Sequence, residues 1–275
     1  MPKTKKKLGL ALGSGGLRGF FHLGVLKCLN KHSIKIDYLA GSSMGALIAT
    51  LYALYQDVDK IEKIMTKNKS STFRSLIDFS VKGGLIRGNK FEQRLRHWVN
   101  NSSFKDTKIP LSIVTTDLVK GKEKIYTKGK IAKYLRASMS VPTMFEPVSI
   151  KGKILSDGGL TNPVPDDVVK EMGAEVVIGV SLDDYRKKRD FTAKDISIRR
   201  IAMRSIEILR YSLSNFSTCN SDFVIKRQVP IDSISFSILN EYFRKGNGKW
   251  RKVIKMGETE TEKKIKKIKK ALRNS

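Results

Sequence analysis

A short serine turn bounded by glycines constrains this chain more than any other feature. The turn is Gly41-Ser42-Ser43-Met44-Gly45. Residues 36–39 before it are typical of a buried strand, and residues 43–55 after it stay apolar long enough to predict a buried helix. A serine on so tight a strand-to-helix turn needs near neighbours without side chains. We therefore predict that the Ser43 hydroxyl stands at the amino end of the helix, where the helix dipole favours negative charge.

A plainer interpretation of the same residues is a loop followed by a helix cap. Serine is a preferred residue at the start of a helix, and glycine is common in turns. The strand before the motif and the helix after it favour the functional interpretation. That interpretation requires the rest of the chain to supply a base and a site for an oxyanion.

A glycine-rich loop precedes the serine turn and offers such an anion site. The loop, Gly13-Ser14-Gly15-Gly16-Leu17-Arg18-Gly19, joins a predicted strand at residues 8–12 to a predicted helix that begins near residue 20. Its spacing fits neither the dinucleotide motif G-x-G-x-x-G nor a P-loop, which needs Gly-Lys-Ser/Thr. The backbone N–H groups of Gly15 and Gly16 are candidate donors to the oxyanion of a tetrahedral acyl intermediate.

The three histidines of the chain are poorly placed to serve as the base. His22 lies in the first turn of the first helix, His32 at its polar end, and His97 on a helix whose histidine we expect to face solvent. None of them follows a predicted strand, where the base of a Ser-His-Asp triad is normally held. We therefore expect a carboxylate to act as the base.

Asp157 is the best candidate for that carboxylate. It ends a predicted strand and is followed by Gly158 and Gly159, which allow the backbone to crowd the site. Asp117 and Asp37 are the runners-up. The alternative for Asp157 is a purely structural Asp-Gly turn.

Strand and helix patterns alternate along the chain and predict an α/β fold with a mostly parallel sheet. Such sheets place their ligands at the carboxyl ends of strands, where the glycine loop, Ser43 and Asp157 are expected. We predict a basic N-terminal arm at residues 1–7, a core at 8–182, and a helical part at 183–275 that packs on the core and ends in a basic helix. The other predicted elements are a mobile cover at 76–87, helices at 131–137 and 164–172, a hairpin at 148–155, strands at 175–182 and 223–225, and an amphipathic helix at 196–216 packed on the sheet.

Composition limits the location and the partners of the protein. The chain has 54 Lys+Arg against 26 Asp+Glu, a formal charge of +28 that attracts polyanions such as anionic lipid headgroups and nucleic acid. The plainer interpretation is a lysine-rich, solvated surface. Two distant cysteines, Cys28 and Cys219, form neither a disulfide framework nor a metal motif. The longest apolar run is too short to span a bilayer, so we predict a cytoplasmic protein with peripheral contact at the inner face of the membrane. Residues 244–273 predict a surface helix on the body, with contact to headgroups as the alternative.

Taken in order, the glycine loop, the serine turn and Asp157-Gly158-Gly159 resemble the patatin-like phospholipases, in particular their smaller single-domain bacterial members. Family-like sequence also occupies residues 21–26, 136–142 and 162–165, and the resemblance covers most of residues 8–182. It implies a three-layer α/β/α fold, a serine–aspartate dyad, hydrolysis of lipid acyl esters, and no metal or organic cofactor.

Carried onto this sequence, the resemblance implies Ser43 as nucleophile, Asp157 as proton acceptor, and Gly15 and Gly16 as oxyanion donors. The first motif of the family commonly has three consecutive glycines, and Ser14 occupies the first of those places. The remaining motif positions support these groups: Gly13, Arg18, Gly19, Gly41, Gly45, Gly158 and Gly159.

The sequence thus predicts a serine acyl hydrolase of the phospholipase A or lysophospholipase type. The alternative is a catalytically weak regulatory protein that binds anionic membrane surfaces. We rank nucleic-acid binding lowest, because the chain has the charge for it but no motif that reads bases. No obligate protein partner follows from the sequence.

Overall fold

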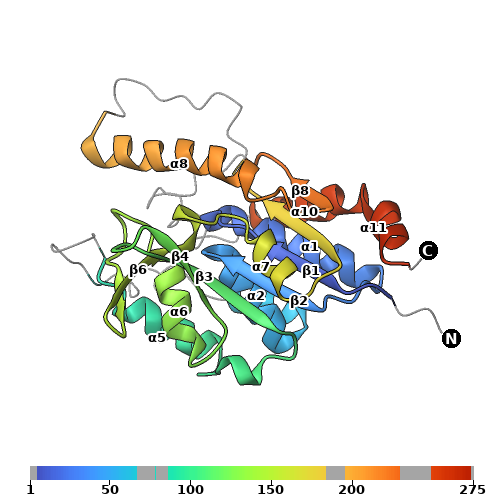
Figure 1. Ribbon diagram of the computed structural model, residues 1–275, viewed down its shortest axis with the longest axis horizontal. Coiled ribbons are helices and arrows are strands. Elements are labelled where there is room, and N and C mark those ends of the chain that lie inside the picture. Colours follow the sequence, from blue (N-terminus) through green and yellow to red (C-terminus); the bar gives the residue numbers. More distant parts are fainter. Residues whose placement is uncertain (1–4, 67–77, 79–85, 184–195, 230–248, 274–275) are drawn as a thin grey trace.

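An eight-stranded sheet forms the centre of the molecule (Figure 1). The computed structural model describes residues 5–66, 78, 86–183, 196–229 and 249–273. The strands are β1 (Leu8–Leu12), β2 (Tyr38–Ser42), β3 (Leu111–Asp117), β4 (Lys122–Tyr126), β5 (Val148–Ile150), β6 (Lys153–Asp157), β7 (Val176–Ser181) and β8 (Phe223–Lys226). They follow the order β5-β6-β3-β2-β1-β7-β8, with β4 also paired to β3.

Helices connect these strands and cover the sheet. The α-helices are α1 (Phe20–Lys31), α2 (Met44–Tyr55), α3 (Val58–Thr66), α5 (Asn89–Trp98), α6 (Ile131–Ser138), α7 (Asp166–Glu171), α8 (Ile198–Phe216), α10 (Lys249–Glu262) and α11 (Ile265–Ala271). Short 3-10 turns lie at η1 (Gly16–Gly19), η2 (Phe104–Asp106) and η3 (Gly158–Leu160).

Alternate residues of the central strands face two separate cores. On β1, Leu10 and Leu12 join the larger core with α1 and α2, while Ala11 faces the smaller core beneath α7. The strand β1 pairs in parallel with both β2 and β7, and the parallel ladder continues to β3 and β8. A mostly parallel sheet with helices on both faces confirms the predicted α/β fold class.

Two strands meet end to end on one edge of β3, and this arrangement was not predicted. The parallel strand β2 ends where Ser42 pairs with Val114. From the opposite direction, β6 ends where Asp157 pairs with Thr115, the next residue of β3. We expected Asp157 at the carboxyl edge of a parallel sheet, but β6 is antiparallel to β3. Asp157 therefore reaches the end of β2 because its strand runs toward β2.

The hairpin predicted at residues 148–155 is β5 with β6, and the strand predicted at 223–225 is β8. The helices predicted at 131–137 and 164–172 are α6 and the shorter α7. The predicted cover at residues 76–87 lies largely outside the described residues. None of the described helices is both long and apolar enough to cross a membrane.

The prediction that the apolar side of α8 packs on the sheet is wrong. This helix lies along the outside of the body (Figure 1), with Leu209 69% and Phe216 74% exposed. Its buried side carries Glu207 and Arg210 instead. The ion pair of Arg210 with Asp183 holds this polar side against the body, so the apolar side faces outward.

The helix α10 packs along α1, and two glycines make the close approach possible. A Cβ atom on Gly24 would overlap the carbonyl oxygen of Ile254, and one on Gly257 would overlap that of Phe21. Backbone atoms cannot rotate away as a flexible side chain can. In the basic segment that follows, Ile265 is buried against the body.

We expect Gly24→Ala to destabilise the protein. In an ordinary helix this change stabilises by about 1 kcal/mol. Here the new methyl group would meet the backbone of α10, and overpacking of this kind costs about 1–3 kcal/mol or more. Urea denaturation followed by circular dichroism should therefore show a lower unfolding free energy. Lys266→Ala, at an exposed position of α11, is the control and should change stability by less than about 0.5 kcal/mol. An unchanged or more stable Gly24→Ala protein would contradict the close crossing.

Candidate active site

Ser43 occupies a strained turn between β2 and α2. Its backbone has φ 54° and ψ −121°, outside the regions that residues with side chains prefer. A Cβ atom on Gly41 would lie 2.5 Å from the nitrogen of Ala46, and one on Gly45 would overlap the carbonyl oxygen of Leu12. The turn therefore requires both glycines, as the sequence pattern predicted.

The side chains of Ser43 and Asp157 are in direct contact. The Ser43 hydroxyl donates to Oδ2 of Asp157 at 2.7 Å, and both residues are buried, with 5% and 3% exposure. The other carboxylate oxygen accepts the N–H of Gly159 at 2.8 Å. Asp157 thus makes the Asp-Gly turn that was the structural alternative and also faces the serine.

The glycine loop lies beside both residues. A Cβ atom on Gly19 would overlap the side chain of Met44, next to the serine, and one on Gly159 would lie 2.7 Å from Oγ of Ser14. Segments far apart in the sequence, at residues 13–19, 41–45 and 157–159, therefore form one site.

The N–H groups of this loop have different partners. Gly13 donates to the carbonyl of Val180 at 3.0 Å, and Ser14 donates to that of Pro163 at 2.8 Å. Within the described parts of the chain, the N–H groups of Gly15 and Gly16 make no hydrogen bond. Gly16 has φ +54°, a conformation natural to glycine. The N–H of Ser14 is therefore bonded within the protein itself.

The histidines have structural surroundings. Nε2 of His22 lies 2.8 Å from the carbonyl oxygen of Gly13 and therefore carries the hydrogen, which braces the loop. Burial lowers the pKa of His22 to about 4, so its ring is neutral at physiological pH. His32 contacts Glu262 at 2.8 Å, and His97 is exposed.

The runner-up carboxylates also have structural partners. Asp117 accepts the N–H groups of Val119 and Lys120 in the turn after β3. Asp37 accepts the N–H of Leu8 at 2.9 Å and pairs with Lys35. Asp157 is the carboxylate that the structure places on Ser43.

Opposing influences set the proton affinity of Asp157. Burial raises its pKa above the ordinary value for a carboxyl, and this is the largest effect. The positive charge of Arg210 and the hydrogen bonds from Ser43 and Gly159 lower the pKa, without cancelling the effect of burial. A carboxylate with raised proton affinity is a better base than an ordinary aspartate.

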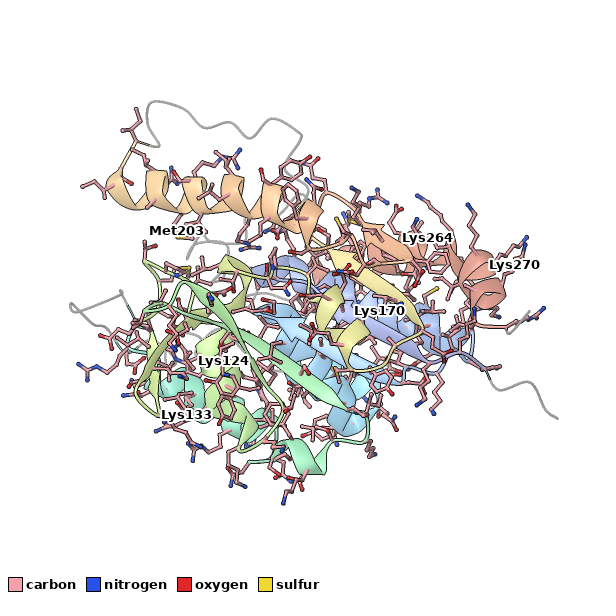
Figure 2. All side chains as sticks on the ribbon, in the orientation of Figure 1. Lys124, Lys133, Lys170, Met203, Lys264 and Lys270 are labelled. Carbon is pink, nitrogen blue, oxygen red and sulfur yellow. The ribbon has the colours of Figure 1, made fainter. Side chains whose placement is uncertain are left out.

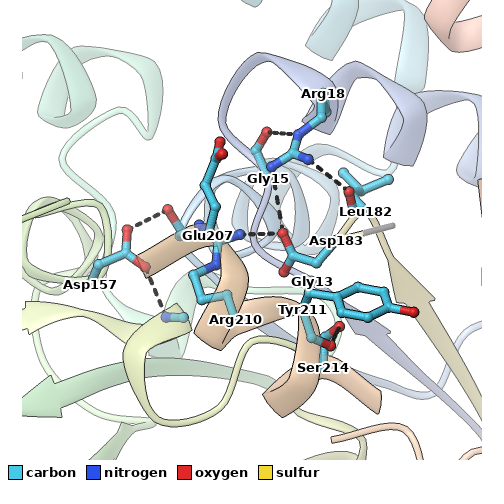
Figure 3. Close-up of polar contacts among 12 residues, drawn as sticks. Gly13, Gly15, Arg18, Asp157, Leu182, Asp183, Glu207, Arg210, Tyr211 and Ser214 are labelled. Carbon is cyan, nitrogen blue, oxygen red and sulfur yellow. Dashed lines mark hydrogen bonds and ion pairs between the residues drawn. The ribbon is translucent and has the colours of Figure 1, made fainter. Parts of the chain in front are cut away.

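Arg210 belongs to a buried charge cluster that joins α8 to the glycine loop (Figure 3). Asp183, just after β7, pairs with Arg210 at 2.6 Å and with Arg18 at 3.5 Å. Arg18 in turn donates to the carbonyl oxygens of Gly15 and Leu182. The cluster therefore fixes the loop and the position of α8 relative to Asp157.

The sequence did not indicate the residues that hold Ser43 and Asp157 in place. The N–H of Ser43 donates to Oγ of Ser138 at 2.9 Å, and the Thr116 hydroxyl donates to the carbonyl oxygen of Asp157 at 2.8 Å. The family-like segment at 136–142 contains Ser138, but no pattern in it indicated a contact with the serine turn. The sequence does not indicate the contact between Arg210 and Asp183 either. The two residues are 27 positions apart, and a buried ion pair produces no periodic pattern.

A second cluster of polar side chains lies between α1 and α10. One possible ligand atom each from Cys28, His32 and Glu262 lies within 4.8 Å of the others. Lys31 and Lys269 also contact this group, at 3.5 Å from Glu262 and 3.3 Å from His32. Their positive charges oppose the binding of a cation there.

The sequence of this chain is similar to those of several known proteins. The family model described as patatin-like phospholipase matches residues 10–169. An uncharacterized NTE family protein of Mycobacterium bovis is 33% identical over 184 residues, which are 66% of this chain and 50% of that protein. The lysophospholipase NTE1 of Pyricularia oryzae is 30% identical over 186 residues, 65% of this chain and 12% of that protein.

One solved structure extends the comparison beyond the matched sequence. VipD from Legionella pneumophila covers 96% of this chain and 67% of its own, with a TM-score of 0.62 at 15% identity, which is a likeness of fold. This chain spans about half the length of the mycobacterial relatives it matches. Because the family model covers more than half of the chain, including the glycine loop, Ser43 and Asp157, the chain belongs to the patatin-like phospholipase family.

Proposed function

We propose that this protein is a serine acyl hydrolase that cleaves lipid acyl esters through Ser43 and Asp157. The observation that supports this most directly is the 2.7 Å hydrogen bond between the two side chains on a strained turn. Membership of a lipid hydrolase family and the free N–H groups of Gly15 and Gly16 add to it.

In the proposed reaction, Asp157 accepts the proton of Ser43 as Oγ attacks the ester carbonyl. The N–H groups of Gly15 and Gly16 donate to the oxyanion of the tetrahedral intermediate. When the intermediate collapses, Asp157 returns the proton to the leaving alcohol, and the acyl group remains on Ser43. Asp157 then takes a proton from a water molecule as that water attacks the acyl-serine. The proton passes from Asp157 to Oγ of Ser43 as the fatty acid leaves, which restores the serine hydroxyl and the carboxylate.

The proposed substrates are phospholipids or lysophospholipids, cleaved in the manner of a phospholipase A or lysophospholipase. This choice rests on the family and on relatives named as lysophospholipase and neuropathy target esterase. We further propose a cytoplasmic location with peripheral contact at the inner face of the membrane, in keeping with the charge of +28.

A catalytically weak regulatory protein that binds anionic membranes is the second candidate, and the net charge favours it. A serine-directed fluorophosphonate separates the two functions, because it labels only an activated serine. Absence of label on the folded wild-type protein would favour the regulatory function.

We expect Ser43→Ala and Asp157→Asn each to lower hydrolysis of a short-chain chromogenic ester by about 10³-fold or more. The first variant removes the nucleophile, and the second removes the group that accepts its proton. Initial rates under saturating substrate provide the measurement, with circular dichroism to establish folding.

Ser42→Ala is the matched control, because Ser42 is a buried neighbour whose hydroxyl has no hydrogen-bond partner among the described residues. It should retain fluorophosphonate labelling, and Ser43→Ala should lose it. Folded Ser43→Ala or Asp157→Asn protein with wild-type rates would overturn the proposed dyad.

We expect Arg210→Gln to move the acidic limb of the kcat/KM profile to higher pH. Asp157 must be ionised to act as a base, so activity increases as the pH rises through its pKa. The charge of Arg210 lowers that pKa, and its removal raises the pKa. Arg204→Gln is the control, since Arg204 pairs with Glu207 on the same helix and should leave the limb in place. A limb that stays fixed in Arg210→Gln, or moves to lower pH, would contradict this electrostatic role.

A further inference from the structure

The helix α8 presents its apolar side to solvent and its polar side to the protein. The buried positions Met203, Glu207, Arg210 and Ser214 recur at the spacing of one helix face. The outward side carries five large apolar side chains, each at least 47% exposed: Ile198, Ile201, Ile208, Leu209 and Phe216. In an ordinary surface helix of a globular protein, the apolar side faces the core.

Contacts on the inner side fix this orientation. Arg210 pairs with Asp183 at 2.6 Å, and the Thr143 hydroxyl lies 2.9 Å from the sulfur of Met203. Figure 3 shows Arg210 of α8 joined to Asp183, with Asp157 nearby. A rotation that buried the apolar side would separate the buried Arg210–Asp183 pair, which is strongly unfavourable. The apolar side therefore remains outward, on the side of α8 opposite to Arg210 and Asp157.

The outer face of α8 combines apolar side chains with an absence of negative charge. The helix contains one acidic residue, Glu207, and that residue is only 2% exposed. Arg200 and Ser205 are also exposed on this helix. An exposed apolar helix side on a strongly basic chain is typical of helices that lie in the headgroup region of a bilayer.

The charge of the chain distinguishes a membrane from a second copy of the protein. Each copy carries +28, so two copies repel each other, whereas an anionic lipid surface attracts the chain. The basic side chains lie on many elements, including Lys124 on β4, Lys133 on α6 and Lys170 on α7 (Figure 2). The charge alone therefore does not indicate which face of the protein contacts the membrane. The apolar side of α8 does indicate it.

We infer that α8 lies flat on an anionic phospholipid bilayer, with Ile208, Leu209 and Phe216 inserted among the lipids and the active site beneath its inner side. This inference rests on the proposed function, because a lipid-ester hydrolase must meet its substrate at such a surface. The 19 residues of α8 extend over about 28 Å along the membrane plane.

The test is co-sedimentation of the full chain with vesicles of phosphatidylcholine alone or mixed with phosphatidylglycerol. We expect the wild-type protein to prefer the anionic vesicles. The double variant Leu209→Glu/Phe216→Glu should bind them at least about tenfold more weakly than the wild-type protein, because two inserted side chains become charged. Both positions are exposed, so the variant should keep its fold and its rate on a soluble short-chain ester.

Lys266→Gln/Lys267→Gln on α11 is the matched control, since it lowers the net charge by the same amount at exposed positions of the basic C-terminal helix. It should bind anionic vesicles nearly as well as the wild-type protein. Wild-type binding by the α8 variant, or an equal loss in the α11 variant, would overturn the inference. So would analytical ultracentrifugation showing a wild-type dimer that the α8 variant disperses, together with no binding to vesicles.

The outcome is separable from that of the proposed function. Ser43→Ala protein should bind vesicles as the wild-type protein does, because the serine is buried and lies outside the docking face. Vesicle binding that depends on α8 in a protein without esterase activity would refute the hydrolase proposal and leave the docking surface supported. Esterase activity together with vesicle binding that does not depend on α8 would overturn the docking surface and leave the hydrolase proposal supported.

Discussion

The contact between Ser43 and Asp157 depends on how two strands share one edge of β3. The parallel strand β2 occupies that edge up to Val114, and the antiparallel strand β6 occupies it from Thr115 onward. The end of one strand therefore faces the end of the other, and the side chains that follow them come within 2.7 Å. Because the backbone ladder of β3 fixes both strands, the geometry of the pair does not rely on a flexible loop.

Glycine allows the other segments to approach this point. The serine turn packs against the end of β1 so closely that Gly45 leaves no room for a side chain. The loop after β1 is anchored through Gly13 and Ser14, while the next two N–H groups have no partner among the described residues. An oxyanion site requires a fixed backbone whose N–H donors have no other partner. Such donors are already in place before negative charge develops on the reacting oxygen.

The sequence predicts the local parts of this site better than their assembly. The strained turn at Ser43 and the glycine loop each lie within a few consecutive residues, so their steric requirements are visible in the sequence. The direction of β6 depends on pairing with β3, forty residues away, and no periodicity reports it. The apolar stripe of α8 was found, but its orientation was predicted wrongly. The buried ion pair of Arg210 with Asp183, and not the number of apolar residues, decides which side faces inward.

The same ion pair joins the chemistry of the site to its surface. Burial favours the protonated form of Asp157, and the positive charge of Arg210 favours the ionised form. Arg210 is held in place by Asp183, so the charge near Asp157 depends on α8 staying docked. The helix α8 carries apolar residues on its outer side and Arg210 on its inner side. Contacts on the outer side are therefore linked, through the position of the helix, to the proton affinity of Asp157. Displacing α8 would take away the positive charge of Arg210, which favours the ionised form of Asp157 that accepts the proton of Ser43.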